Sequence, residues 1–351
     1  MSDSETLFEI KGSIGLITLN RPKALNSLTH GMAVAIKDQL AVWTKDDQVQ
    51  AVVVTGSGEK AFCAGGDVVR VAQSYKAGTD EWRAFFHDEY LMNVAIAEFP
   101  KPYISLVDGI TMGGGVGVSI PGDFWVATEK TLFAMPETGL GLFPDVGGGW
   151  FLPRMPGESG MFIALTGARL KAPDLHALGL ASHVVASADI PELIEALSIK
   201  AIHCGNCVKD VLDAFHSDPG SAPLMEFVDG IDEHFAGFSV EDIISGLRAD
   251  TSDWAQKQAD IMATKSPTSL KVTFEQLRRG EALETFRDAM IMEFRIVNRM
   301  MEGADFFEGV RAILIDKDNK PTWSPATLAD VSDEAVAAYF APLGDGCELA
   351  V

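Results

Sequence analysis

Two carboxylates stand eight residues apart in a segment that carries no other charged side chain. Glu137 and Asp145 lie within residues 135–149, where the remaining positions are glycine, proline, threonine or apolar. Apolar surroundings raise the pKa of a carboxyl group, which makes it useful as a general acid or base near neutral pH. Glycines and a proline between the two acids forbid a continuous helix, so the fold must set their geometry. The segment indicates acid–base or nucleophilic chemistry, the alternative for Asp145 being to cap a helix that begins near Val146.

Two glycine-rich breaks could supply backbone N–H donors. Residues 62–67 follow a strand and a loop and precede a helix expected over 67–74, whereas residues 112–117 follow a strand expected over 103–107 and open a helix over 113–119. N–H groups in the first turn of a helix have no partner within it, and a pair of them can stabilise the oxyanion that develops on an ester or a thioester. The alternative is that the glycines only allow a helix to pack closely against a strand.

Several other catalytic signatures are missing from the sequence. It contains no Gly-Lys dipeptide, no GxGxxG and no HExxH, and Pro121 replaces the second glycine of a nucleophile elbow around Ser119. Cys204 and Cys207 form a lone CxxC, for which chance spacing or a half-buried helix pair is favoured over metal or redox chemistry. We therefore expect no metal and no bound cofactor.

The charge balance limits the classes of partner. The chain has 28 Lys plus Arg and 50 Asp plus Glu, a formal net charge of −22, and no run of basic residues. This argues against nucleic acids and anionic membrane surfaces as partners, and no stretch has the roughly 18 uncharged apolar residues of a spanning helix. The acidic residues 1–5 do not resemble a secretory or transit signal, and four cysteines are too few for a disulfide framework. We expect a cytoplasmic enzyme.

The elements that must position these residues fall into two parts. In the first, a strand–strand–helix unit recurs, which predicts an α/β fold of stacked sheets. Strands are expected over 7–11, 14–20, 51–55, 103–107, 124–128, 132–135 and 184–185, with a helix over 30–44 that Thr29 can cap. From residue 189 the strand signals stop and amphipathic helices follow. We predict a core domain over 1–188 and a helical C-terminal region over 189–351.

One of the C-terminal helices, expected over 283–301, carries an apolar stripe. Its members recur at helical spacing, and they are Met290, Met292, Phe294, Val297, Met300 and Met301. Packing or a subunit contact is favoured over a ligand role for such a stripe.

Taken together, the motifs resemble those of the enoyl-CoA hydratase/isomerase (crotonase) superfamily. The resemblance covers residues 7–190 and rests on residues 62–67, residues 110–115 and the Pro136-Glu137 pair, in this order and spacing. Within the superfamily the chain is most similar to the 3-hydroxyisobutyryl-CoA hydrolases, through residues 112–117, 134–138 and 141–149. The resemblance implies the crotonase (ClpP-like) fold and a coenzyme A (CoA) thioester as substrate.

The resemblance also separates hydrolysis from hydration. Hydratases of the superfamily use two glutamates, one in the first turn after the glycine triplet and one at the Pro-Glu position. Here Gly117 occupies the first position, whereas Glu137 is retained and Asp145 is added. We therefore expect a hydrolase that converts 3-hydroxyisobutyryl-CoA to 3-hydroxyisobutyrate and CoA in valine breakdown. The alternatives are a hydratase or isomerase of the same fold and a non-catalytic acyl-CoA-binding protein.

The resemblance assigns roles to the candidate catalytic residues. The N–H groups of Gly66 and Gly114 would form the oxyanion hole. Glu137 would act as the nucleophile or as the general base on water, and Asp145 would handle the second proton. Glu89, in a helix expected over 82–99, would bind the substrate's 3-hydroxyl, although the residue pattern alone favours a solvent-exposed helix acid. Gly114, Glu137 and Asp145 would join Glu89 in contacting the substrate.

The resemblance further implies where CoA binds. Arg21, Lys23 and Ala24, together with Ala64 and Gly65, match positions at which relatives hold the CoA nucleotide. In a chain this acidic, Arg21 and Lys23 are the expected local sources of positive charge for its phosphates. CoA is part of the substrate, so no separate cofactor is expected. Members of the superfamily commonly form trimers or pairs of trimers, and a homo-oligomer is possible here.

Overall fold

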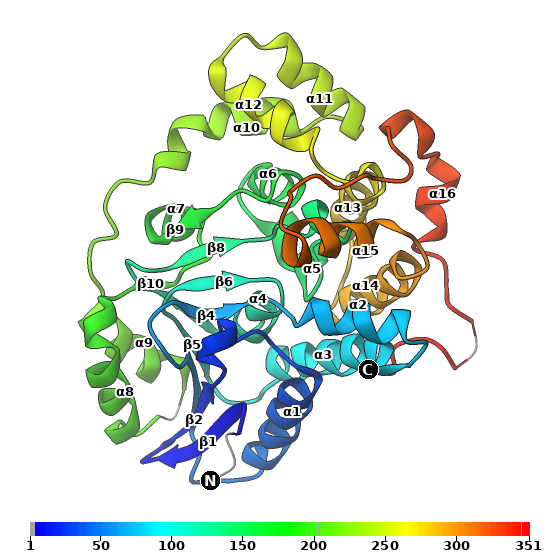
Figure 1. The fold of residues 1–351 in the computed structure, drawn as a ribbon. Helices are drawn as coiled ribbons and strands as arrows, with labels where there is room; N and C mark the ends of the chain where they lie inside the picture. The colour runs from blue at the N-terminus through cyan, green and yellow to red at the C-terminus, as the bar shows by residue number, and fades with distance from the viewer. Residues whose placement is uncertain (1–3, 203, 345) are drawn as a thin grey trace. The chain divides into compact units, whose positions relative to one another are not determined.

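In the computed structural model, strands and helices alternate up to residue 184 and helices follow, as the sequence pattern predicts (Figure 1). The structure describes residues 4–202, 204–344 and 346–351, and within them the strands lie between residues 6 and 184. The chain forms two compact units that interleave along the sequence. The first contains Met1–Asp67, Asp88–Phe133 and Leu170–Met225, and the second contains Val68–His87, Ala134–Arg169 and Glu226–Val351. The boundary at residue 188 stays a prediction, since each unit draws on both sides of it.

A six-stranded sheet belongs to the first unit, in the order β1-β2-β3-β5-β7-β10. The pair β1 and β2 is antiparallel and all other neighbours are parallel. The two central strands, β3 and β5, are buried on both faces, which explains their continuous apolar runs. The bounds are β1 Thr6–Lys11, β2 Ile14–Leu19, β3 Ala51–Gly56, β5 Tyr103–Val107, β7 Phe124–Ala127 and β10 His183–Val184.

A second sheet has four short strands in the order β4-β6-β8-β9. Their bounds are β4 Ala61–Ala64, β6 Ile110–Met112, β8 Leu132–Ala134 and β9 Leu170–Lys171. Consecutive strands alternate between the two sheets. The six-stranded sheet contains β3, β5 and β7, and the four-stranded sheet contains the strand that follows each of them, β4, β6 and β8. This alternation is the recurring unit that the sequence predicts. The strands β4 and β6 themselves were not predicted, because they are three or four residues long and run directly into the glycine motifs.

Helices cover the strands of the first unit. One face of the six-stranded sheet packs against α8 and α9 through a core of buried aliphatic side chains that includes Val53, Leu106, Leu193 and Leu212. As predicted, Thr29 caps α1, its hydroxyl accepting the N–H of Met32 at 3.2 Å. The bounds are η1 Pro22–Ala24, α1 His30–Thr44, α3 Glu81–Ala97, α4 Gly114–Ser119, α7 Ala172–Ala177, η4 Ser187–Asp189, α8 Ile190–Ile199 and α9 Gly205–Phe215, α3 beginning in the second unit.

The second unit is helical. Its longest helices start at side-chain caps, with Ser266 before α13 and a Thr285–Asp288 capping box before α14. The apolar stripe on α14 is buried, as its packing role predicts. The bounds are α2 Val68–Lys76, η2 Glu137–Leu140, α5 Gly148–Phe151, η3 Leu152–Arg154, α6 Ser159–Thr166, η5 Pro223–Phe227, α10 Val228–Phe235, α11 Val240–Ala249, α12 Asp253–Met262, α13 Pro267–Gly280, α14 Phe286–Met300, α15 Asp305–Val310, η6 Arg311–Ile315, η7 Leu328–Asp330 and α16 Asp333–Ala338. Among the described residues, no helix has both the length and the apolar character that a membrane span requires.

Candidate active site

The two glycine breaks of the first unit lie side by side because the strands before them are neighbours. β4 and β6 pair in parallel, and the carboxyl ends of adjacent parallel strands meet at one edge of a sheet. Gly65 and Gly113 continue from these ends with φ of +110° and +44°, conformations that glycine adopts without steric cost. A Cβ placed on Gly114 would lie 3.2 Å from the backbone nitrogen of Gly66. The fold therefore brings together the two residues predicted to donate to an oxyanion.

The N–H groups of Gly66 and Gly114 are not used in the hydrogen bonds of the strand bridge and the helix to which these residues belong. Gly66 forms a parallel bridge with Leu28, in which Leu28 donates to the carbonyl of Gly65 at 2.8 Å and accepts the N–H of Asp67 at 2.9 Å. In such a bridge the N–H of the middle residue points to the opposite side, so the N–H of Gly66 points away from Leu28. Gly114 is the first residue of α4, where an N–H has no acceptor within the helix.

Glu89 lies at the same place. It is 2% exposed on α3, and a Cβ on Gly114 would lie 2.7 Å from its Oε1. The neighbouring acid on this helix, Asp88, instead binds His30 at 2.6 Å and Lys37 at 3.4 Å. The expectation from the residue pattern alone, a solvent-exposed acid, is wrong for Glu89, and its burial beside Gly114 agrees with the position that the resemblance implies.

Arg21 is bound by groups of the protein itself. Its Nε lies 3.0 Å from Glu5 and its Nη2 lies 3.3 Å from Asp67, while its Nη1 donates to the carbonyl of Ser27 at 2.6 Å. These contacts fix the loop after β2 to the segment that carries Gly66. The part of Arg21 in holding CoA stays a prediction, but the guanidinium is already occupied by two carboxylates.

Lys23 is better placed to meet a phosphate. It lies with Ala24 on η1, exposed to solvent, and it lines a hollow of about 380 Å³ whose other members include Lys60 and Glu59. Among the described residues, neither lysine forms an ion pair, so both ammonium groups are available to a ligand. Lys60 was missed by the sequence reasoning, although it directly precedes β4, the strand that ends at Ala64.

Glu137 is a buried carboxylate in the second unit. It begins η2 and is 5% exposed, and its Oε2 has no hydrogen-bond partner among the residues that the structure describes. Burial raises its pKa well above the ordinary value, and the negative charge of Asp145 raises the pKa further. Lys265 acts in the opposite direction, and its own pKa is lowered by burial. Glu137 therefore has the raised proton affinity that its apolar surroundings predict.

Asp145 lies in the same unit and is 5% exposed. It does not cap a helix, because α5 begins at Gly148 with Gly147 as its N-cap residue. The backbone carbonyl of Asp145 accepts the N–H of Gly148 at 2.8 Å. Val146, the next residue, has φ of +51°, which is a strained conformation for a β-branched side chain. The alternative role for Asp145, a helix cap, is wrong.

Two polar residues of the C-terminal helices reach this segment. Glu293 of α14 is fully buried and accepts the N–H groups of Gly147 at 2.9 Å and Gly149 at 2.8 Å. Gln276 of α13 donates to the carbonyl of Pro144 at 2.8 Å. The sequence reasoning missed both residues. The available signal was that Glu293 is a single acid inside the apolar stripe of its helix.

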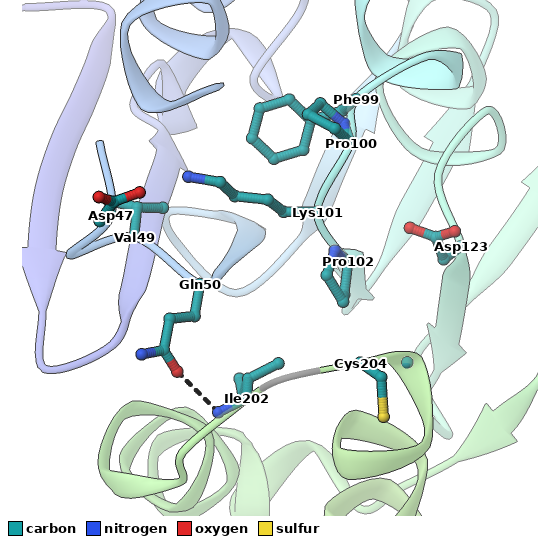
Figure 2. A pocket seen from close by; sticks show the side chains of 11 residues that line it. Asp47, Val49, Gln50, Phe99, Pro100, Lys101, Pro102, Asp123, Ile202 and Cys204 are labelled. Atoms are coloured by element: carbon teal, nitrogen blue, oxygen red, sulfur yellow. Dashed lines mark hydrogen bonds between the residues drawn. The ribbon is translucent and has the colours of Figure 1, made fainter. Parts of the chain in front are cut away.

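A separate hollow of about 460 Å³ lies in the first unit, and Figure 2 shows the residues around it. Its lysine, Lys101, is bound to the carbonyls of Trp43 at 2.6 Å and Asp46 at 2.8 Å, at the end of α1. The N–H of Ile202 donates to Oε1 of Gln50 across one side (Figure 2). None of the predicted site residues lines this hollow, and Lys101, its one cation among the residues that the structure describes, already has backbone partners.

The cysteine pair lies beside that hollow. The Sγ atoms of Cys204 and Cys207 are 3.7 Å apart, within hydrogen-bonding distance, and they are not joined by a disulfide bond. Across the described ranges, no group of three or more His, Cys, Asp or Glu side chains is arranged to hold a metal ion.

Comparisons with known proteins agree with the geometry of the site. The family model for enoyl-CoA hydratase/isomerase matches residues 14–340 of the chain. A curated protein of Xenopus tropicalis named 3-hydroxyisobutyryl-CoA hydrolase, mitochondrial, is 48% identical over 350 residues, which cover 98% of this chain and 91% of that protein. A curated protein of the same name from Danio rerio is 49% identical over 347 residues, which cover 97% and 91%.

A solved structure is similar over almost the whole chain. It is titled as a carnitinyl-CoA dehydratase from Mycobacterium thermoresistibile and has 45% sequence identity and a TM-score of 0.92, covering 99% of this chain and 98% of that one. The activity in its name, a dehydratase, differs from the hydrolase activity in the names of the two curated relatives.

The expectation of a cytoplasmic enzyme is wrong by this comparison, because both curated relatives are named as mitochondrial proteins. That expectation rested on the residue types at positions 1–5 and on a low cysteine count. A low cysteine count indicates a reducing compartment, and it does not distinguish one reducing compartment from another.

Proposed function

Because the chain belongs to the enoyl-CoA hydratase/isomerase family, we propose that it hydrolyses 3-hydroxyisobutyryl-CoA to 3-hydroxyisobutyrate and free CoA. The predicted family and the crotonase fold are confirmed. The protein is an enzyme of the CoA-thioester hydrolase type, as the curated relatives are by name. The structural observation that carries the proposal is that Glu137 and Asp145 are both buried. Gly117 stands at the position where hydratases of the superfamily have their other glutamate.

The proposed chemistry assigns one role to each predicted residue. Water, or the Glu137 carboxylate itself, attacks the thioester carbon, and the electron pair of the carbonyl moves to its oxygen. The N–H groups of Gly66 and Gly114 donate to that oxygen. The carbonyl then re-forms as the C–S bond breaks, and the CoA thiolate leaves and takes up a proton, a transfer that we propose Asp145 handles.

The raised pKa of Glu137 supports a role as base. A carboxylate with increased proton affinity removes a proton from water more readily, and an Oε2 without a partner is free to do so. If Glu137 is instead the nucleophile, it forms a mixed anhydride that a second step hydrolyses with water. Neither route consumes anything but water, so we propose that the enzyme needs no cofactor.

Binding is proposed to follow the same residues. Glu89 would accept a hydrogen bond from the substrate's 3-hydroxyl, and its burial beside Gly114 supports this role. Lys23 would meet the phosphates of CoA, with Arg21, Ala24, Ala64 and Gly65 shaping the loop around it. We also propose that 3-hydroxyisobutyryl-CoA reaches the enzyme from valine breakdown, and that the chain forms a homo-oligomer as members of its superfamily commonly do.

Hydration of an enoyl-CoA is the second candidate function. The solved structure with 45% sequence identity favours it, because that protein is named a dehydratase, and a dehydratase removes water and releases no thiol. Gly117 lies in α4 and has no side chain to supply the second acid. However, Glu89 places a carboxylate beside Gly114 from a different helix, so a second acid is not missing from the fold.

Thiol release from a small panel of CoA thioesters tests the proposal. The purified protein is given 3-hydroxyisobutyryl-CoA, isobutyryl-CoA, which lacks the hydroxyl, and crotonyl-CoA. We expect thiol release to be fastest with the first compound and crotonyl-CoA to be unchanged. Loss of the double-bond absorbance of crotonyl-CoA without thiol release from any compound would support the hydratase instead. Binding without turnover of any compound would support the non-catalytic alternative.

A further inference from the structure

The segment that follows Glu137 in the second unit has a backbone conformation that it could not keep by itself. Val146 has φ of +51° and Gly147 has φ of +99°. A left-handed conformation is unfavourable for a β-branched residue, and it persists only where the surroundings fix it. Since Val146 directly follows Asp145, whatever fixes this conformation also sets the direction in which the Asp145 side chain leaves the backbone.

The hydrogen bonds that fix the segment come from helices far along the chain. Glu293 accepts two N–H groups, from Gly147 on Oε2 at 2.9 Å and from Gly149 on Oε1 at 2.8 Å. Gln276 binds the carbonyl of Pro144 at 2.8 Å and also donates to Oε1 of Glu293 at 3.3 Å. Both side chains are fully buried, so no water competes for these bonds.

The close approach of the two partners is built into the sequence. A Cβ on Gly149 would lie 3.0 Å from Nε2 of Gln276 and 3.1 Å from Oε1 of Glu293. A side chain at this position would require both polar groups to shift by a few tenths of an ångström. Glycine therefore lets Gln276 and Glu293 approach the backbone of the segment without such a shift.

The charge of Glu293 is also sensitive to Asp145. Burial raises the pKa of Glu293 well above its ordinary value, the hydrogen bond from Gly147 lowers the pKa, and the negative charge of Asp145 raises it. Burying a carboxyl group removes it from water at a cost in free energy, whereas an apolar side chain could fill the same volume without that cost. Packing alone therefore does not explain a glutamate at this position beside a candidate catalytic acid.

We propose that Glu293 is a positioning residue, which acts with Gln276 to hold residues 144–149 so that the Asp145 carboxylate has one fixed orientation. This inference rests on the proposed function for its catalytic consequence. That Glu293 holds the segment through two N–H groups is independent of the reaction that the protein catalyses.

A Glu293→Gln variant breaks this arrangement while keeping the shape of the side chain. The amide has one acceptor oxygen, and its NH2 group cannot accept the second N–H of the segment. If Asp145 moves by about 1 Å, a loss in kcat of roughly 10- to 100-fold is expected. KM for the thioester should stay within about twofold, since Glu293 does not contact the substrate in this account. A Gln276→Met variant removes the other contact and should lower kcat in the same direction.

A matched control is Asp174→Asn. Asp174 is also a buried carboxylate that accepts a backbone N–H, that of Leu224 at 2.9 Å, but it lies on α7 in the first unit. If loss of a buried carboxylate acted only through general stability, this variant would lower kcat as much as Glu293→Gln does. We expect its kcat to equal that of the wild type.

Two readouts decide the proposal. The first is kcat and KM for thiol release from 3-hydroxyisobutyryl-CoA, and the second is amide hydrogen exchange of the peptide that covers residues 144–149. Faster exchange in that peptide together with a kcat-selective loss supports the proposal. Unchanged exchange, or faster exchange with a wild-type kcat, overturns it. A wild-type protein that releases no thiol refutes the proposed function alone, and the exchange measurement then still decides whether Glu293 holds the segment.

Discussion

Replacing Glu137 with glutamine should make the protein more stable and nearly inactive. The carboxylate is buried, its Oε2 has no hydrogen-bond partner among the described residues, and it lies in the field of a second acid, Asp145. Glutamine keeps the volume of the side chain and removes the charge. The substitution therefore removes a buried negative charge that destabilises the folded protein. We ascribe the presence of this charge to catalysis and not to folding.

The size of the stabilisation follows from the cost of an unsatisfied buried polar group. That cost is about 1–3 kcal/mol, and it is larger for a charged group. An increase of this size in the free energy of unfolding raises the unfolding midpoint by about 2–4 °C per kcal/mol for a domain of 150–250 residues. Loss of a general base lowers kcat by roughly 10²- to 10⁴-fold.

The stabilisation should depend on pH in a definite direction. The pKa of Glu137 is raised in the folded protein above the ordinary value of 4.5. Between these two values the folded state binds more protons than the unfolded state, so the stability of the wild type falls as pH rises through this range. Glu137→Gln lacks this loss, and its advantage should be small near pH 4.5 and grow toward neutral pH.

Thermal unfolding and thiol release, measured on the same preparations, check this prediction. Glu233→Gln is the matched control, because Glu233 is an exposed acid on α10 in the same unit and its replacement should change stability by less than about 0.5 kcal/mol. A lower unfolding midpoint for Glu137→Gln, or a kcat within tenfold of the wild type, would refute the reasoning.

Three further variants test other parts of the site. Asp145→Asn removes the charge that raises the pKa of Glu137, so the acid limb of the pH profile of kcat/KM should move to lower pH. An acid limb that stays in place or moves to higher pH would contradict this coupling. Gly114→Ala places a Cβ 2.7 Å from Oε1 of Glu89 and 3.2 Å from the nitrogen of Gly66, and kcat should fall roughly 10-fold or more. Its control is Gly31→Ala, in the first turn of α1, where the atom nearest to the new Cβ would be 3.9 Å away and kcat should not change. Equal kcat in both variants would count against the N–H groups of Gly66 and Gly114 as donors to the oxyanion. Lys23→Ala combined with Lys60→Ala should raise KM about 5-fold at constant kcat, since each exposed charge contact contributes up to about 1 kcal/mol. Lys257→Ala, an exposed lysine of α12, is the control for it, and an equal KM in both would show that the hollow beside Lys23 does not hold the CoA phosphates.

The sequence located the residues of the glycine breaks but not the reason that they meet. Two helices and two strands lie between Gly66 and Gly114 in the sequence, and a local pattern carries no information on which strands pair. Their proximity comes from the parallel register of β4 and β6, which places both breaks at one edge of the sheet. The resemblance to a family supplied the pairing that local reasoning lacked.

Charged residues were predicted less well than glycines, because their type does not reveal their partners. The expected contact of Arg21 with CoA stays a prediction, and the sequence did not reveal that Glu5 and Asp67 bind this side chain. Glu89 resembled a solvent-exposed helix acid and is buried. Each outcome depends on contacts between segments far apart in the sequence.

Glu293 could not be assigned for a similar reason. One acid within an apolar stripe suggests an imperfection of a packed helix, and only the structure shows that its two oxygens accept the N–H groups of Gly147 and Gly149. The prediction for Glu137 was better because its apolar surroundings are local in the sequence. A raised pKa follows from those surroundings before the fold is known.

The central claim is that this protein breaks the C–S bond of a 3-hydroxyacyl-CoA and does not remove water from it. Incubating the purified protein with 3-hydroxyisobutyryl-CoA in heavy-oxygen water, followed by mass spectrometry of the products, distinguishes the two reactions directly. The account predicts free CoA and 3-hydroxyisobutyrate with the heavy oxygen in its carboxylate. An unsaturated acyl-CoA with its thioester intact, and no free CoA, would contradict it.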